Sequence, residues 1–116
     1  MIRLLFDTNF LIYSFDDKID IKRLLDSSMT DSYRLYALQQ CINELKTIGR
    51  RDVAAWAESY GFTILEKEDG RKADDILLEK SKQGFHIATN DKALYSKVIK
   101  HGGKAVKFSG RFISVQ

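Results

Sequence analysis

Residues 2–9 read Ile-Arg-Leu-Leu-Phe-Asp-Thr-Asn, and this stretch decides the fold. A mostly apolar run over residues 2–6 is followed at once by three polar residues of the kind that begin helices. A short apolar run without alternation is typical of a strand that is buried on both faces. We therefore expect a buried strand over 2–6 and a helix that begins after Asn9.

The same alternation of strand and helix continues along the chain. We expect further strands over 34–38, 62–65, 85–88 and 104–108, and helices over 18–27, 40–48, 51–60, 73–83 and 91–101. Glycines separate several of these segments, and Gly61 suits the end of a helix. This order predicts a three-layer α/β/α fold with a central, mainly parallel sheet. Residues 109–115 are expected to add a hairpin strand at one edge.

Length and composition predict a single domain over residues 1–116. Hydrophobic residues make up 44% of the chain, which is enough to build a core. The longest apolar run, at 53–57, is far shorter than the roughly 20 residues that span a bilayer. Asp7 lies where a signal peptide carries its apolar segment. We therefore expect a soluble cytoplasmic protein that makes no membrane contact.

Cysteine and histidine are too scarce to carry the chemistry of a metal site. The chain has one cysteine, Cys41, and two histidines, His86 and His101. A single cysteine excludes an intramolecular disulfide and a cysteine-rich zinc module. No P-loop or dinucleotide-binding glycine motif occurs either. A bound metal would therefore be held by oxygen.

Four acids occupy positions that a parallel sheet brings toward one end. Asp7 and Asp91 follow strands, Asp74 opens a helix, and Glu44 lies early in the helix after a strand. Each has an ordinary explanation by itself, because aspartates cap helices and acids favour the first helical turn. Taken together, they would lie where ligands gather in such folds, beyond the carboxyl ends of the strands.

Helical geometry refines two of these positions. Glu44 falls three residues after Cys41 and four before Ile48, on the apolar stripe of its helix. A carboxylate there is costly unless its charge is compensated, although Glu44 could also extend to solvent at the margin of the stripe. Asp74 projects to the inward side of its helix, whereas Asp75 belongs to the solvated side. Asp74 is therefore preferred, with Asp75 as the second choice.

Four carboxylates at one site repel one another strongly unless cations are present. Oxygen ligands of this kind suit Mg²⁺ or Mn²⁺. Such ions polarise a phosphate and lower the pKa of a bound water, so hydrolysis of a phosphodiester is the expected chemistry. With these four acids set aside, 19 lysines and arginines stand against the remaining 12 of the 16 acids. That balance favours an anionic substrate.

The four acids and their neighbours resemble the PIN-domain nucleases over residues 3 to 108. The matching segments are Asp7-Thr8-Asn9, Glu44 in a mid-chain helix, Ala73-Asp74-Asp75-Ile76-Leu77 and Ala88-Thr89-Asn90-Asp91. The resemblance implies a Mg²⁺- or Mn²⁺-dependent endoribonuclease that cuts single-stranded RNA. Its catalytic, metal-binding acids would be Asp7, Glu44, Asp74 and Asp91. Asn9 and Thr89 would orient the neighbouring groups.

Within this family, Asp7-Thr8-Asn9-Phe10-Leu11 and Ala73-Asp74-Asp75 look most like the archaeal relatives of the small-subunit-processome PIN nuclease, which implies a role in pre-ribosomal RNA processing. A VapC-type toxin with an antitoxin partner is the alternative, and so is a catalytically inactive RNA- or ribosome-binding scaffold. The sequence does not identify the RNA target or the number of bound metals, and it is compatible with a homodimer. Basic residues that flank the acidic segments are the candidate RNA contacts. They are Lys46, Arg50, Arg51, Arg71, Lys72 and Lys92.

Overall fold

The centre of the fold is β1 (Ile2–Phe6), which lies between two parallel neighbours, β2 (Tyr33–Leu38) and β4 (His86–Ala88). The structure, a computed structural model, describes residues 1–109 and 112–115. Beyond β2 lies β3 (Thr63–Leu65), and beyond β4 lies β5 (Lys104–Ser109), both parallel. The expected mainly parallel sheet is confirmed.

The last strand, β6 (Phe112–Val115), pairs antiparallel with β5 and completes the order β3-β2-β1-β4-β5-β6. This is the hairpin strand expected from the tail. Residues 110 and 111, which belong to the same expectation, lie outside the described residues. β6 occupies one edge of the sheet, on the side away from β3.

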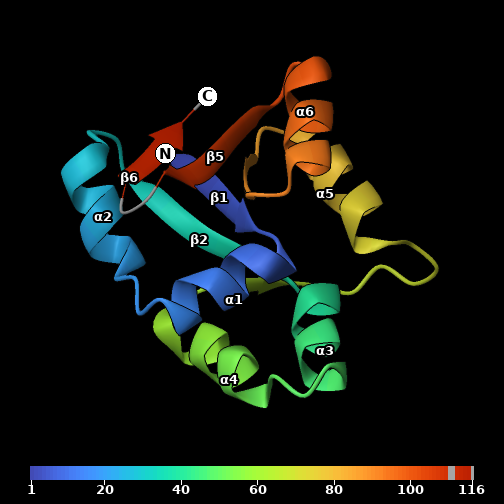
Figure 1. Cartoon of the computed structure of the whole chain (residues 1–116). Coiled ribbons are helices and arrows are strands. Elements are labelled where there is room, and N and C mark those ends of the chain that lie inside the picture. The colour runs from blue at the N-terminus through green and yellow to red at the C-terminus, as the bar shows by residue number, and fades with distance from the viewer. Residues whose placement is uncertain (110–111, 116) are drawn as a thin grey trace.

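Six helices cover the sheet (Figure 1). They are α1 (Thr8–Asp16), α2 (Ile21–Ser28), α3 (Gln39–Thr47), α4 (Arg51–Tyr60), α5 (Ala73–Lys82) and α6 (Lys92–Lys100). None of these helices, in the part of the chain that is described, is long and apolar enough to cross a bilayer.

Alternate side chains of β1 enter two separate cores, which makes the three layers. Leu4 and Phe6 join a core formed with α1, α2 and α4, whereas Leu5 joins a core formed with α5 and α6. These three side chains are at most 2% exposed. A strand that is buried on both faces is uniformly apolar, as residues 2–6 are apart from Arg3. The expected α/β/α architecture is confirmed.

The helix boundaries differ most from expectation at α2. The sequence predicts a helix from residue 18, but Lys18 has a positive φ of 53° and the helix begins at Ile21. Asp20 caps it by accepting a hydrogen bond from the backbone N–H of Arg23 at 3.3 Å. At α4 the expected end is found, because Gly61 adopts a φ of 109°, a conformation that glycine tolerates without strain.

The connections reverse direction at β1, and this reversal places the site. From β1 the chain moves outward through β2 and β3, and then returns to β4 on the other side of β1 before reaching β5. The carboxyl ends of β1 and β4 are therefore a switch point of the sheet. In open α/β folds the crevice at such a point is where ligands bind.

Candidate active site

Asp7, the first residue after β1, is held through its backbone N–H and both of its carboxylate oxygens. Its backbone N–H donates to the carbonyl oxygen of Ala88 at the end of β4, at 3.1 Å. Its Oδ1 accepts from the backbone N–H of Phe10 at 2.7 Å, which caps α1, and its Oδ2 accepts from the hydroxyl of Thr89. The residue is only 6% exposed. One carboxylate oxygen is thus fixed by the first turn of α1, and the other by the residue that follows β4.

Asp91 has a related arrangement at the start of α6. Its Oδ1 accepts from the backbone N–H groups of Ala93 and Leu94, at 2.8 and 3.1 Å. Its own N–H donates to the hydroxyl of Thr89 at 3.0 Å. Asp7 and Asp91 are therefore helix caps, as the simpler sequence interpretation has it. Capping does not remove them from the site, since it also fixes where their carboxylates lie.

A single small cavity of about 70 Å³ is lined by all four predicted acids. They are Asp7, Glu44, Asp74 and Asp91. Asn9 lines the same cavity, whereas Asp75 is not among its lining residues. Thr89 is fully buried behind Asp7 and reaches the site through its hydroxyl. The structure thus brings together acids that are up to 84 residues apart in the sequence.

Ile48 does not belong to the apolar stripe on which Glu44 was expected to lie. The helix ends at Thr47, and Ile48 is its C-cap, with 54% of its surface exposed. The buried residues of α3 are instead Cys41, Ile42 and Leu45. Glu44 is itself exposed, and it lies one helical turn after Cys41, which lines the cavity. Its proximity to Cys41, and not the position of Ile48, brings it to the site.

Of the lining residues that were not predicted to be functional, two have polar side chains. Thr8 and Cys41 lie beside Asp7 and Glu44. Burial raises the pKa of the Cys41 thiol to about 11, although a hydrogen bond from Thr8 acts in the other direction. The thiol is therefore neutral at neutral pH and forms a wall of the site. In the sequence, the position of Cys41 three residues before Glu44 indicates that the two side chains lie on the same face of the helix.

The buried position of Asp7 changes the pKa of its carboxyl group. Burial, the largest cause, raises the pKa of Asp7 to about 6 from an ordinary value of 3.8. The hydrogen bonds from Thr89 and Phe10 lower it, and the negative charges of Asp74 and Asp91 raise it. Proximity to other carboxylates makes the ionised form of Asp7 costly, and a nearby cation would relieve that cost.

The donor chemistry of the cavity fits Mg²⁺ or Mn²⁺. Within residues 1–109 and 112–115, no three Asp, Glu, His or Cys side chains are grouped closely enough to hold an ion as they stand. Mg²⁺, however, is usually bound through one or two carboxylates and keeps several waters. Glu44 and Asp74 are exposed, so their side chains can turn toward Asp7, whereas the carboxylate of Asp91 is held by its capping hydrogen bonds. The four acids are thus suited to a hydrated hard cation.

The basic residues proposed as RNA contacts have different surroundings. Arg50 donates to both carboxylate oxygens of Asp16, at 2.6 and 3.0 Å, and also pairs with Asp52. Lys46 lies 3.7 Å from a carboxylate oxygen of Glu58. These contacts favour structural roles for both residues.

The remaining four candidates are exposed. Arg71 pairs with Glu68 and Glu79. Lys72 precedes α5, and Arg51 is an exposed residue in the first turn of α4. Lys92 follows Asp91 directly and lines a separate, larger cavity. Of the six candidates, Lys92 lines a cavity beside the acids, and Lys72 directly precedes Ala73, which lines the acidic cavity.

The fold, with the acids at this edge of the sheet, is that of a PIN domain. The solved structure described as "Structure of the PIN domain endonuclease Utp24" superposes with a TM-score of 0.85, at 25% sequence identity. The match covers 98% of this chain and 90% of that one. No protein-family model and no curated protein sequence matches the chain. The resemblance seen in the sequence is thus confirmed by the fold.

Proposed function

We propose that this chain is a metal-dependent endoribonuclease that hydrolyses phosphodiester bonds in single-stranded RNA. The observation that carries the proposal is the convergence of four carboxylates on one cavity at the switch point of the sheet. The endonuclease Utp24, whose fold matches nearly the whole chain, supports cleavage within a nucleic-acid strand. The lysine and arginine excess of the chain supports an anionic polymer as substrate.

In this proposal Asp7, Glu44, Asp74 and Asp91 hold Mg²⁺ or Mn²⁺. The bound ion supplies charge neutralisation at the phosphate and lowers the pKa of a coordinated water. The protein itself holds the carboxylate oxygens of Asp7 in the positions from which they would bind the ion. Asp7 is fixed by Phe10 and Thr89, so its carboxylate needs no reorientation when the substrate binds.

Two polar neighbours complete the proposed machinery. The hydroxyl of Thr89 donates a hydrogen bond to the carboxylate of Asp7 and accepts one from the backbone N–H of Asp91. Asn9 is exposed and lines the acidic cavity, so its amide can hydrogen-bond to the phosphate or its attacking water. Thr89 is a positioning residue, and Asn9 is a candidate substrate contact.

The biological substrate we propose is pre-ribosomal RNA, and the proposed location is the cytoplasm. This rests on the likeness of the segments around Asp7 and Asp74 to archaeal small-subunit-processome PIN proteins. Co-sedimentation of the protein with pre-ribosomal particles would support this role. Growth arrest on expression, relieved by a small protein encoded next to the chain, would instead support the toxin role.

The neighbouring aspartates on α5 provide a matched test of the nuclease. Asp74 lines the cavity, whereas Asp75, its exposed neighbour, does not. We expect Asp74→Asn to lower kcat on a labelled single-stranded RNA at least about a hundredfold, as loss of one preorganised electrostatic group does. Asp75→Asn, which makes the same charge change, should cleave like the unaltered protein.

Metal removal completes this test. Cleavage with Mn²⁺ or Mg²⁺ should stop in EDTA and return when the metal is restored. Cleavage that persists both in EDTA and in Asp7→Asn would overturn the metal-dependent mechanism. Metal-independent RNA binding without any cleavage would instead identify an inactive scaffold.

A further inference from the structure

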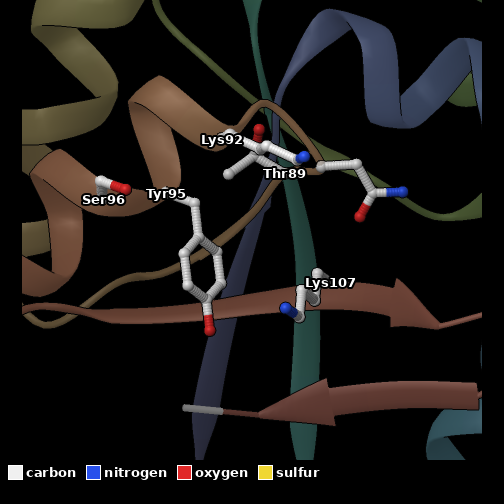
Figure 2. A pocket seen from close by; sticks show the side chains of 6 residues that line it. Thr89, Lys92, Tyr95, Ser96 and Lys107 are labelled. Carbon is white, nitrogen blue, oxygen red and sulfur yellow. The ribbon is translucent and has the colours of Figure 1, made fainter.

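Next to the acidic cavity lies a larger pocket of about 480 Å³ with a different chemical character. It is formed by the loop after β4, the first turns of α6 and the strand β5 (Figure 2). Its lining residues are Thr89, Asn90, Lys92, Tyr95, Ser96 and Lys107. Two of them are cationic, and no acid belongs to the described lining. The volume falls within the range of about 300–1,000 Å³ that is usual for small-molecule sites.

Thr89 joins this pocket to the acidic cavity. It lines the pocket, and its hydroxyl donates to the carboxylate of Asp7. Asp91 and Lys92, which are consecutive, line the acidic cavity and the pocket respectively. A strand of nucleic acid with one phosphate at the acids therefore has its neighbouring nucleotide beside the pocket.

Tyr95 and Lys107 line the pocket from α6 and β5. Tyr95 extends from α6 toward β5, where Lys107 projects into the same opening (Figure 2). The ammonium nitrogen of Lys107 lies 5.1 Å from the centre of the Tyr95 ring. Tyr95 is half-buried against the core of α5 and α6, whereas Lys107 and Lys92 are exposed. A half-buried aromatic ring thus lines the same pocket as two exposed lysines.

We propose that this pocket binds the nucleotide next to the cleaved bond. Its phosphate is held by Lys92 and Lys107, and its base or sugar packs against the ring of Tyr95. Aromatic side chains combined with cations form the usual binding surface for single-stranded nucleic acid. The amide of Asn90 and the hydroxyl of Ser96 supply polar groups for the edge of the base. This inference rests on the proposed ribonuclease function and assigns one of its substrate subsites.

The test compares two lysines that carry the same charge but lie in different places. Lys107 lines the pocket, whereas Lys100 is an exposed residue in the last turn of α6 outside it. Lys107→Ala and Lys100→Ala therefore change the net charge equally. Tyr95→Leu removes the aromatic surface and leaves an apolar residue of similar volume against the core. Circular dichroism and melting temperatures establish that each variant is folded.

Affinity is measured with a fluorescent single-stranded oligouridylate in EDTA, so that binding is separated from cleavage. We expect Lys107→Ala and Tyr95→Leu each to raise Kd about fivefold or more, since stacked bases and phosphate contacts contribute at least this much. Loss of one phosphate contact in Lys107→Ala should also reduce the slope of log Kd against log salt by about 0.7. Lys100→Ala should leave both quantities unchanged.

Cleavage with Mn²⁺ distinguishes this inference from the proposed function. The pocket variants should raise KM and leave kcat near that of the unaltered protein, because the lost contact is made before the bond breaks. RNA cleavage with equal Kd and KM for Lys107→Ala and Lys100→Ala would overturn the pocket assignment and leave the ribonuclease intact. Pocket-dependent RNA binding without metal-dependent cleavage would retain the pocket and overturn the ribonuclease. Failure of the unaltered protein to bind the oligonucleotide would overturn the pocket assignment.

Discussion

The hydroxyl of Thr89 donates a hydrogen bond to Oδ2 of Asp7, a residue 82 positions earlier in the chain. The hydroxyl oxygen of Thr89 in turn accepts a hydrogen bond from the backbone N–H of Asp91 at 3.0 Å. One buried hydroxyl therefore connects the carboxyl ends of β1 and β4 and sets the positions of two acids. Its replacement should affect both stability and activity.

We expect Thr89→Val, which keeps the shape of the side chain, to lower both the free energy of unfolding and kcat. The change leaves the backbone N–H of Asp91 and an oxygen of Asp7 without this partner. An unsatisfied buried polar group costs about 1–3 kcal/mol. Chemical denaturation measures the first effect, and RNA cleavage at saturating substrate measures the second.

Thr89→Ser is the control, since it retains the hydroxyl and loses only a methyl group. It should recover most of kcat. Equal losses in the serine and valine variants would mean that packing of the methyl group, and not the hydrogen bonds, is what matters at this position.

Divalent metal should stabilise the protein because the cavity gathers negative charge. A metal that binds only the folded chain stabilises it by about 2.7 kcal/mol at a hundredfold excess over its Kd. We expect Mn²⁺ or Mg²⁺ to raise the melting temperature of EDTA-treated protein. The rise should be smaller in Asp74→Asn and unchanged in Asp75→Asn. An equal rise in both variants would place the metal elsewhere.

Adjacent arginines at the start of α4 should separate structural from RNA-binding roles. Arg50 is paired with Asp16 at the end of α1 and with Asp52, whereas Arg51 is an exposed residue of the first turn. Arg50→Ala should lower the melting temperature more than Arg51→Ala. It should not weaken RNA binding more than the loss of one positive charge does in Arg51→Ala. If the Kd for RNA rose in Arg50→Ala but not in Arg51→Ala, Arg50 would be an RNA contact after all.

The fold could be predicted from the sequence because its signals are local. The apolar run at 2–6 and the turn at Gly61 each define an element without reference to the rest of the chain. The prediction fails at α2, where the cap at Asp20 starts the helix later than residue 18. The prediction also fails at Ile48, which was expected on the apolar stripe of α3 but lies just after the last residue of that helix.

The site could be predicted only in part, because part of it depends on packing. Topology alone brings residues that follow β1 and β4 to one edge, so the order of the acids suggested their convergence. The contact between Tyr95 and Lys107 has no such signal. It depends on how α6 lies across β5, which neither segment specifies alone. Lys107 was accordingly absent from the basic residues chosen from the sequence.

Asp7 should give the metal-free protein a pH-dependent stability with a definite sign. Its pKa of about 6 in the folded chain is above the ordinary 3.8, so the folded state binds this proton more tightly than the unfolded state. The free energy of unfolding therefore decreases as the pH rises from about 4 to about 6, and the loss is complete above that range. A pKa difference of this size corresponds to about 3 kcal/mol.

His86 acts in the opposite direction. Burial and the charge of Lys104 lower the pKa of its ring below the ordinary 6.5. Protonation therefore favours the unfolded state, and this contribution to stability is lost as the pH falls below about 6.5. The pH curve of the unaltered protein mixes the two effects. The contribution of Asp7 is therefore obtained from the difference in stability between the unaltered protein and a variant at Asp7, measured at each pH.

Asp7→Asn removes the titrating group and keeps an oxygen that can accept from the N–H of Phe10. In EDTA we expect this variant to melt at a higher temperature than the unaltered protein at pH 8, with the difference shrinking toward pH 4. Saturating Mn²⁺ should reverse the order at pH 8, because the unaltered site then gains the ion and the variant loses a ligand. A difference in melting temperature that stays constant from pH 4 to pH 8 in EDTA would contradict the raised pKa of Asp7. Greater stability without metal, together with lost activity, would mean that the chain keeps a costly carboxylate for its chemistry.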